Sequence, residues 1–275
     1  MRKITHPGPL ADTRADVVAC HAQPIEVTLR AGQTVTRAMT EGLTKAGCSK
    51  GYLRLDGASL APMNYVIPAP APGDGHAAWY SQTYTQPVAH IQHGGAHLGL
   101  RDGQPFVHCH AIWQDRGMGH VLCDNSVIAD DVTVQGWGFR GAGLVAQPDP
   151  ETQFTLFRPH VEGAPIDGAA FLVTLRPNQD IGRALLGIAQ DNQIARARVE
   201  GIGSLVGTVF EQSPHLESYA TELLIVEGAL QSGEIDLQVA SVGFDGASQT
   251  GRLQAGQNAI CVTGEVLMIA LPDPH

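Results

Sequence analysis

A segment near the N-terminus of this chain recurs in the second half of the sequence with its spacing intact. The residues VTLRAGQTVTRAM at Val27–Met39 and VTLRPNQDIGRAL at Val173–Leu185 agree at seven of their first twelve positions, 146 residues apart and without a gap. Such agreement is hard to obtain by chance in segments of ordinary composition. We therefore interpret the chain as two copies of one domain, which a length of 275 residues also favours.

Each repeated segment begins a helical pattern. Apolar residues follow Val35 in the first copy and Ile181 in the second at the spacing of one helical face. Gly32 and Asn178 precede them at equivalent positions, and we expect both to be N-caps. Short alternating strands come later in both copies, such as FVHCHAIW and IDLQVASV. The predicted fold class is α+β, with two tandem domains that are each a mostly antiparallel sheet with a helix packed on it.

The domain boundaries follow from the repeat and from composition. Residues 68–92, PAPAPGDGHAAWYSQTYTQPVAHIQ, are rich in Pro, Gly and aromatic residues, and the second copy has no counterpart of equal length. Long loops of this kind are often lids or interface arms. The predicted division is an N-terminal arm at 1–24, a first domain at 25–145 that contains the 68–92 insertion, a linker at 146–170 and a second domain at 171–275.

The balance of charged residues limits the partners of the chain. Lys and Arg total 17 against 27 Asp and Glu, a formal net charge of −10, which works against binding to nucleic acid or to an acidic membrane surface. The five cysteines are scattered and never form CxxC, so neither a disulfide framework nor a thiolate zinc site is indicated. The sequence shows no signal peptide and no apolar segment of membrane-spanning length. We expect a cytoplasmic protein with reduced thiols.

The stretch GQPFVHCHAIWQDRGMGHVL, which begins at Gly103, places three histidines on what we expect to be two strands joined by a turn. His108 and His110 project from the same face of one strand, where two imidazoles can converge on one ion. His120 begins the returning strand and can supply a third nitrogen. Three nitrogen donors leave a position for water or substrate, as in catalytic zinc sites. The sequence thus predicts a divalent metal site, with Zn²⁺ the expected ion; polar residues on a half-exposed sheet are the alternative.

The second copy has no histidines at the corresponding place. We expect Asp236, Gln238 and Arg252 there, which would be a poor donor set for zinc, so the second site should be degenerate. The second copy would then mediate assembly or form part of the wall of the pocket in the first copy.

Two further features surround the predicted site. Cys109 lies between two of the histidines and should point to the opposite face of the strand, into the core. His90, His93 and His97 have helical spacing, but two glycines interrupt it. We interpret these three as loop residues first, as pocket-lining residues second and as metal ligands last.

Together these motifs resemble the PPC (plants and prokaryotes conserved) domain, also known as a DUF296-like domain of unknown function. The resemblance rests on the opening strand with its arginine and helix, on GIGSL at Gly201–Leu205, on GQPFVHCHAIW and on GMGHVL, which is similar to the family's Gly-Gly-His-Leu signature. It covers most of residues 25–140 and 171–271. It implies two tandem PPC-like domains, a homotrimer, and a metal held by His108, His110 and His120.

The chain also departs from the family. Met118 replaces the first glycine of the signature, and the Arg-Gly-Arg-Pro hook of DNA-associated plant members is missing. A cupin is the alternative fold because cupins also carry HxH motifs. The glutamate that follows this motif in cupins is absent here, however, and the helix after the first strand fits them poorly.

Three functions are weighed. The first is a metal-dependent enzyme, a zinc hydrolase or lyase that acts on a small carboxylated molecule. Candidates to bind the carboxylate are Arg54, Arg101 and Arg116, and candidates for a general base are Asp115, Tyr65 and the His90–His97 cluster. The second is a DNA-associated regulatory protein, against which the net charge and the missing hook argue. The third is a non-catalytic ligand-binding or assembly protein with a structural metal.

Overall fold

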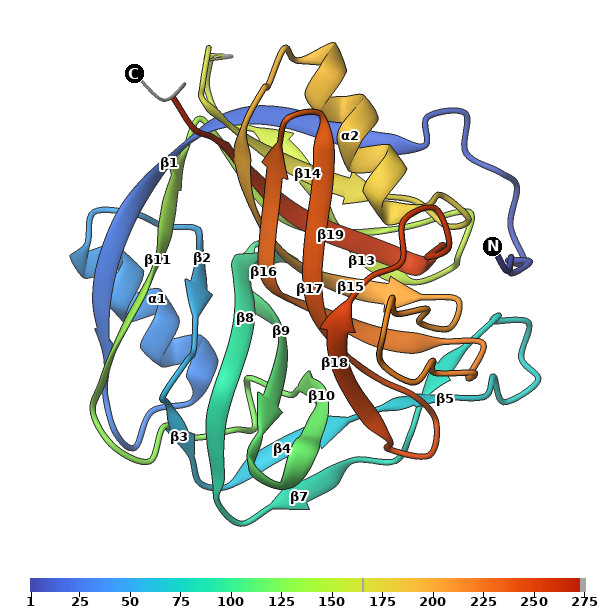
Figure 1. The fold of residues 1–275 in the computed structure, drawn as a ribbon. Coiled ribbons are helices and arrows are strands. Elements are labelled where there is room, and N and C mark those ends of the chain that lie inside the picture. The colour runs from blue at the N-terminus through green and yellow to red at the C-terminus, as the bar shows by residue number, and fades with distance from the viewer. Residues whose placement is uncertain (165, 273–275) are drawn as a thin grey trace.

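The computed structural model describes residues 1–164 and 166–272 (Figure 1). Within them the chain forms 19 strands, two α-helices and one 3₁₀ turn, and the strands pair antiparallel apart from one parallel contact between Val145 and Leu100. The expected α+β class with a mostly antiparallel sheet is therefore confirmed. No helix in this part of the chain has the length and apolar character needed to cross a membrane.

The first half of the chain runs from β1 to β13. Its elements are β1 (Ala15–Leu29), α1 (Val35–Lys45), β2 (Gly51–Arg54), β3 (Ser59–Leu60), β4 (Met63–Val66), β5 (Pro68–Ala69), β6 (Trp79–Tyr80), β7 (Tyr84–Gln86), β8 (Ala89–Arg101), β9 (Gln104–Trp113), the 3₁₀ turn η1 (Gln114–Arg116), β10 (Gly117–Val121), β11 (Val132–Arg140), β12 (Ala142–Pro148) and β13 (Thr155–Val161). The second half consists of β14 (Ala170–Leu175), α2 (Ile181–Asp191), β15 (Ala197–Leu205), β16 (Thr221–Gln231), β17 (Glu234–Val242), β18 (Ser248–Arg252) and β19 (Ile260–Ala270).

The principal elements of the two halves follow one another in the same order. A long strand leads into an 11-residue helix in each half, in the segments where the repeat predicts helices, and the helices begin at Val35 and Ile181. A strand, a long hairpin (β8–β9 or β16–β17), a shorter strand and a closing strand follow in both. This shared order supports the interpretation of tandem copies, which remains a prediction.

The helix N-caps lie two residues beyond the positions that the sequence pattern indicated. Thr34 and Asp180 are the caps, and their side chains accept hydrogen bonds from the backbone N–H groups of Arg37 and Arg183 at 3.3 and 2.9 Å. The prediction of Gly32 and Asn178 as caps was wrong, because these residues form the turn before each helix, with φ of 77° and 66°.

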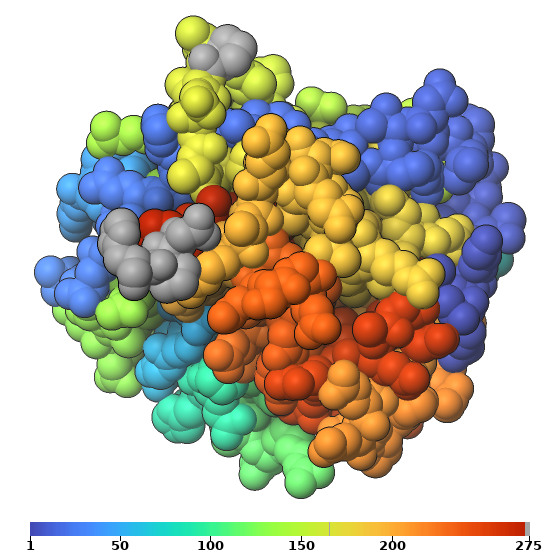
Figure 2. All heavy atoms as spheres, turned by 45° about the horizontal axis from the view of Figure 1, so that its top comes forward, coloured from blue at the N-terminus to red at the C-terminus, as the bar shows by residue number. Residues whose placement is uncertain are grey.

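Strand β1 belongs to both halves. Its residues Ala15–Cys20 pair with β14, whereas His21–Leu29 pair with β11. Much of the expected N-terminal arm at 1–24 is therefore strand. The residues before it lie against the second half, where the backbone N–H of Ile4 donates to Asn178 Oδ1 at 2.9 Å (Figure 2). The expected linker at 146–170 contains β13, which pairs with β12.

Seventeen strands of the described chain form one continuous sheet that β1 joins across the two halves, and we call its first-half and second-half parts the two sheets. Each of these sheets has a helix on one face and the other sheet on its opposite face. Cys109 is fully buried in the cluster under α1, as predicted, and Val239 of β17 occupies the corresponding cluster under α2. On the other face, Met118 and Ile112 of the first half pack against Leu224 of the second half. Because side chains alternate along a strand, the neighbours of Cys109 on β9 point into the space between the sheets.

The two N-caps provide a matched test of helix stability. Thr34→Ala should lower the free energy of unfolding by about 1 kcal/mol, because one N–H of the first turn loses its acceptor. Asp180→Ala should cost about 2 kcal/mol, because Asp180 Oδ2 also accepts from the backbone N–H of Asn258 at 2.9 Å. Urea unfolding of both variants checks this, and a larger loss for Thr34→Ala than for Asp180→Ala would contradict it.

Candidate metal centre

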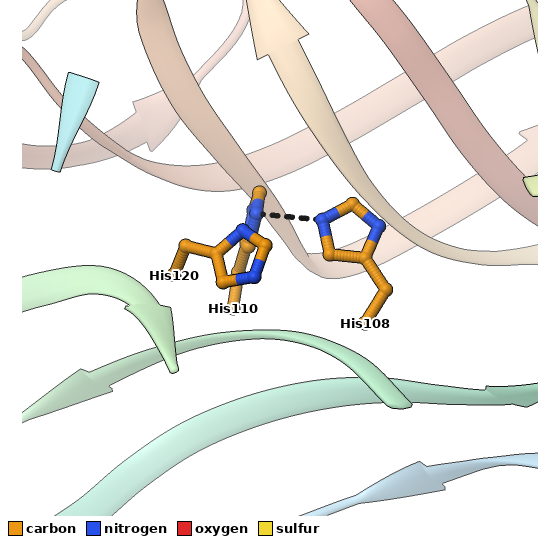
Figure 3. A group of neighbouring side chains, drawn as sticks. All are labelled: His108, His110 and His120. Atoms are coloured by element: carbon orange, nitrogen blue, oxygen red, sulfur yellow. Dashed lines mark hydrogen bonds between the residues drawn. The ribbon is translucent and has the colours of Figure 1, made fainter. Parts of the chain in front are cut away.

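Three imidazoles meet between the two sheets (Figure 3). His108 and His110 project from β9, and the pairing of β9 with β10 places His120 directly opposite His110. One nitrogen from each ring lies within 4.8 Å of the others, and the two Nε2 atoms of His108 and His110 are 3.2 Å apart. Nitrogens that share one tetrahedral zinc ion stand about 3.3 Å apart. The three side chains therefore have the spacing to hold a single ion.

Hydrogen bonds fix the orientation of two of these rings. His110 Nδ1 lies 2.8 Å from the carbonyl oxygen of Leu223, and because a carbonyl only accepts, Nδ1 carries the proton and Nε2 keeps its lone pair. His108 Nδ1 likewise donates to Glu265 Oε2 at 2.7 Å. Carboxylate and carbonyl partners of this kind orient the histidines of metal sites. The arrangement turns both Nε2 atoms toward one point.

The third ring supports the same conclusion. His120 Nδ1 is buried and has no hydrogen-bond partner among the residues that the structure describes. A buried polar atom without a partner is unfavourable, and a metal ion would provide one. The three residues thus fit a divalent metal.

The second half of the chain supplies two carboxylates to this centre. Glu265 of β19 is 1% exposed and Glu222 of β16 is 5% exposed. Besides the bond from Glu265 to His108, Glu222 Oε2 lies 3.3 Å from His110 Nε2. Neither carboxylate was predicted from the sequence. Their only signal is a lone acidic residue inside an apolar strand, in TELLIV and GEVLMIAL.

Burial and charge set the protonation of the centre. Burial lowers the pKa of His110 and His120 well below the ordinary value, so both rings are neutral at pH 7. Burial acts in the same direction on His108, but the Glu265 and Glu222 carboxylates together outweigh it and raise the pKa of His108. Burial raises the pKa of Glu222 to about 7. A divalent cation would balance both carboxylates when they are ionised.

A cavity of about 500 Å³ opens beside the histidines. Its wall includes His108, His120 and both carboxylates, together with Arg101 at the end of β8 and Tyr80 from the 68–92 insertion. The Tyr80 ring lies 5.3 Å from the His120 ring, centroid to centroid. Tyr80 is 37% exposed as a whole residue, but burial of its hydroxyl, reinforced by Glu222 and Glu265, raises the pKa of this hydroxyl well above its ordinary value, so it remains a donor. The cavity volume is typical of small-molecule sites.

The three arginines predicted to bind a carboxylate lie in different parts of the structure. Arg101 lines the cavity, with its guanidinium 5.4 Å from the centroid of the Phe106 ring. Arg54 lies outside the cavity wall, where it pairs with buried Glu200 at 3.0 Å. Arg116 is exposed in the η1 turn.

The predicted general bases Asp115 and Tyr65 do not line the cavity. Asp115 is exposed in the same η1 turn, with a φ of 59°. The Tyr65 ring packs edge-on against Trp113 at 4.7 Å. Glu222, which lines the cavity beside the histidines, is better placed than Asp115 or Tyr65 to accept a proton.

The His90–His97 cluster lies on strand β8, so the expectation of loop residues was wrong. His90 and His93 are exposed. His97 is fully buried between the sheets, and its Nε2 lies 3.2 Å from the carbonyl oxygen of Glu265. His97 pairs with His108 of β9, whereas His93 pairs with Ile112, four residues further along β9, so distance along the strand separates the members of the cluster. His97 therefore contacts the backbone of a residue that orients His108.

The hairpins β8–β9 and β16–β17 show which residues of the second half correspond to the histidines. Both turn at a residue followed by glycine, Asp102–Gly103 and Ser232–Gly233, and all four residues have positive φ. Counted along the strands from these turns, His108 corresponds to Gln238 and His110 to Ala240. His120, which pairs with His110, corresponds to Thr250, which pairs with Ala240. The expected set of Asp236, Gln238 and Arg252 was therefore out of register by two residues. The corrected set contains no imidazole, thiolate or carboxylate.

Comparison with known proteins gives structural matches alone. No family model matches the chain, and no curated protein is similar to it. A metal-containing protein from Archaeoglobus fulgidus has 15% sequence identity and a TM-score of 0.37, with 57% of this chain and 99% of that one covered. A plant- and prokaryote-conserved (PPC) protein from Pyrococcus horikoshii has 10% identity and a TM-score of 0.36, with 57% and 100% covered. A candidate DNA-binding protein from Bacteroides thetaiotaomicron has 16% identity and a TM-score of 0.32, with 40% and 84% covered.

A PPC protein is thus among the solved structures to which the chain is similar, as its sequence motifs predict.

Removing either of two histidines should abolish metal binding. We expect about one divalent ion per chain in the wild type and a small fraction of that in His108→Ala and in His120→Ala, because two nitrogens hold the ion poorly. Mass spectrometry of metal content on untagged protein measures this. His90→Ala is the control, since His90 is exposed on β8. Equal metal content in all four proteins would place the ion elsewhere.

Proposed function

We propose that this chain is a metal-dependent enzyme of the hydrolase or lyase type, with Zn²⁺ at His108, His110 and His120, that acts on a small carboxylated molecule. The observation that carries the proposal is the convergence of the three imidazoles beside a cavity of about 500 Å³. Structural zinc sites are closed by four protein ligands, whereas catalytic sites keep one position open. Three imidazole nitrogens, with His108 and His120 in the cavity wall and no fourth protein ligand among the described residues, match the second kind.

A divalent ion bound there would polarise a carbonyl oxygen or lower the pKa of a water molecule. The residues of the chain divide the remaining tasks. Glu265 and the carbonyl of Leu223 hold two rings in the tautomer that leaves Nε2 free. Glu222 lines the cavity beside His110 and is placed to take up a proton at Oε2. The Tyr80 hydroxyl can donate to an oxygen of the substrate.

The charge of the chain and the composition of the site distinguish the proposal from the other two functions. A DNA-associated role requires attraction to phosphates, and the formal charge of −10 opposes it. A purely structural metal would not need a buried carboxylate in the cavity wall. Turnover of esters, lactones or hydroxy acids by the metal-loaded chain, lost in His120→Ala, is the result that we expect. Full metal occupancy without turnover of any of these classes would favour a structural or ligand-binding role.

The proposal assigns Glu265 to metal affinity. Glu265→Gln should weaken metal binding by about 10- to 100-fold, because an amide partner makes the His108 ring less basic than a carboxylate does. Competition against a chelator of known affinity measures the change. Glu227→Gln is the matched control, since Glu227 is exposed on the strand that carries Glu222. Equal affinity of Glu265→Gln and the wild type would contradict the assignment.

A further inference from the structure

We propose that the ligand of this cavity is an aromatic ring compound with one anionic group, whose ring packs on the aromatic wall and whose anion pairs with Arg101. The proposal rests on the proposed function and specifies its substrate class.

Aromatic side chains are concentrated at this cavity. The whole chain holds 7 Phe, 3 Trp and 5 Tyr, and five of these 15 rings line it. They are Trp79, Tyr80, Phe106, Phe154 and Phe157. The wall of this cavity thus contains a third of the aromatic residues of the chain. This concentration favours a flat apolar ligand, because aromatic rings pack well on one another.

The rings form two groups that β13 and the turn before it connect. On one side Trp79 packs against Phe154, with ring centroids 5.5 Å apart, and His76 completes this group at 4.5 Å from Trp79. On the other side Phe106 packs edge-on against Phe157 at 5.5 Å. Phe154 and Phe157 are three residues apart, so the wall runs from the 68–92 insertion to the β8–β9 hairpin.

Part of this wall is open. Trp79 and Tyr80 are 38% and 37% exposed, which places them among the few exposed large hydrophobic residues of the described chain. They lie next to each other on β6, and both line the cavity. Large aromatic faces left open to water at a cavity are favourable contact surfaces for an apolar ligand. A ring in the cavity would cover them.

The charged side chains of the wall indicate how the ligand is oriented in the cavity. Arg101 is the one lysine or arginine among the described residues that line the cavity, so the wall suits a single carboxylate better than a diphosphate. His97 pairs with His108, and Arg101 lies four residues further along β8, about 13 Å away at the backbone. Glu222 and Glu265 at the histidine end would offset a bound divalent ion, which leaves Arg101 as the side chain of the wall that can pair with an anion. The anionic group therefore lies at the Arg101 end, and the reacting group at the histidines.

Calorimetric titration of the metal-loaded full-length chain tests both parts of this assignment. The probes are 2-naphthoate, its neutral analogue naphthalene-2-carboxamide and its saturated analogue decahydronaphthalene-2-carboxylate. We expect 2-naphthoate to bind about tenfold more tightly than either analogue. Arg101→Gln should abolish the preference over the amide, and Trp79→Leu should abolish the preference over the saturated acid.

A matched cation provides the control. Arg140 is exposed on β11 and lies outside the cavity wall, so Arg140→Gln should keep both preferences. Equal binding of the three probes to the wild type would overturn the substrate class. A preference for naphthoate over the amide that survives in Arg101→Gln would overturn the role of Arg101.

Metal content measured on the same samples separates this proposal from the function on which it rests. Bound metal without either preference contradicts the aromatic, anionic ligand and leaves the metal enzyme standing. Both preferences in a chain that takes up no metal support the ligand class and contradict the metal enzyme.

Discussion

The hydrogen bond between His108 and Glu265 joins the two halves of the chain at the point where three imidazoles meet. The donor lies on β9 and the acceptor on β19, 157 residues later, so the bond forms only when the two sheets pack face to face. The same packing brings the carbonyl of Leu223 to His110. The second half therefore orients histidines that it does not itself contain.

This arrangement explains how buried charges can coexist between two apolar sheets. Met118 and Leu224 belong to the same interface as Glu222 and Glu265, and ionised carboxylates are unfavourable there without a partner. A divalent ion held by the three imidazoles in their neutral form would offset both carboxylates. The strands of the second half contribute the two carboxylates to this interface, and those of the first half contribute the three histidines.

Much of the local structure was predictable from the sequence. The repeat located both helices, although with N-caps two residues too early, and alternation along β9 put Cys109 in the core and its histidine neighbours on the opposite face. Local patterns do not show which sheet a strand faces, and for that reason Glu222 and Glu265 were missed. The same limit applies to β1, whose periodicity is continuous although it pairs with β14 and then with β11.

Anomalous diffraction at the zinc edge, from crystals of the metal-loaded chain, tests the composite centre most directly. The predicted result is one strong peak between His108, His110 and His120, with Glu265 still bonded to His108 Nδ1. A peak at the exposed His90 or His93, or no peak between the sheets in a fully loaded sample, would contradict the centre described above.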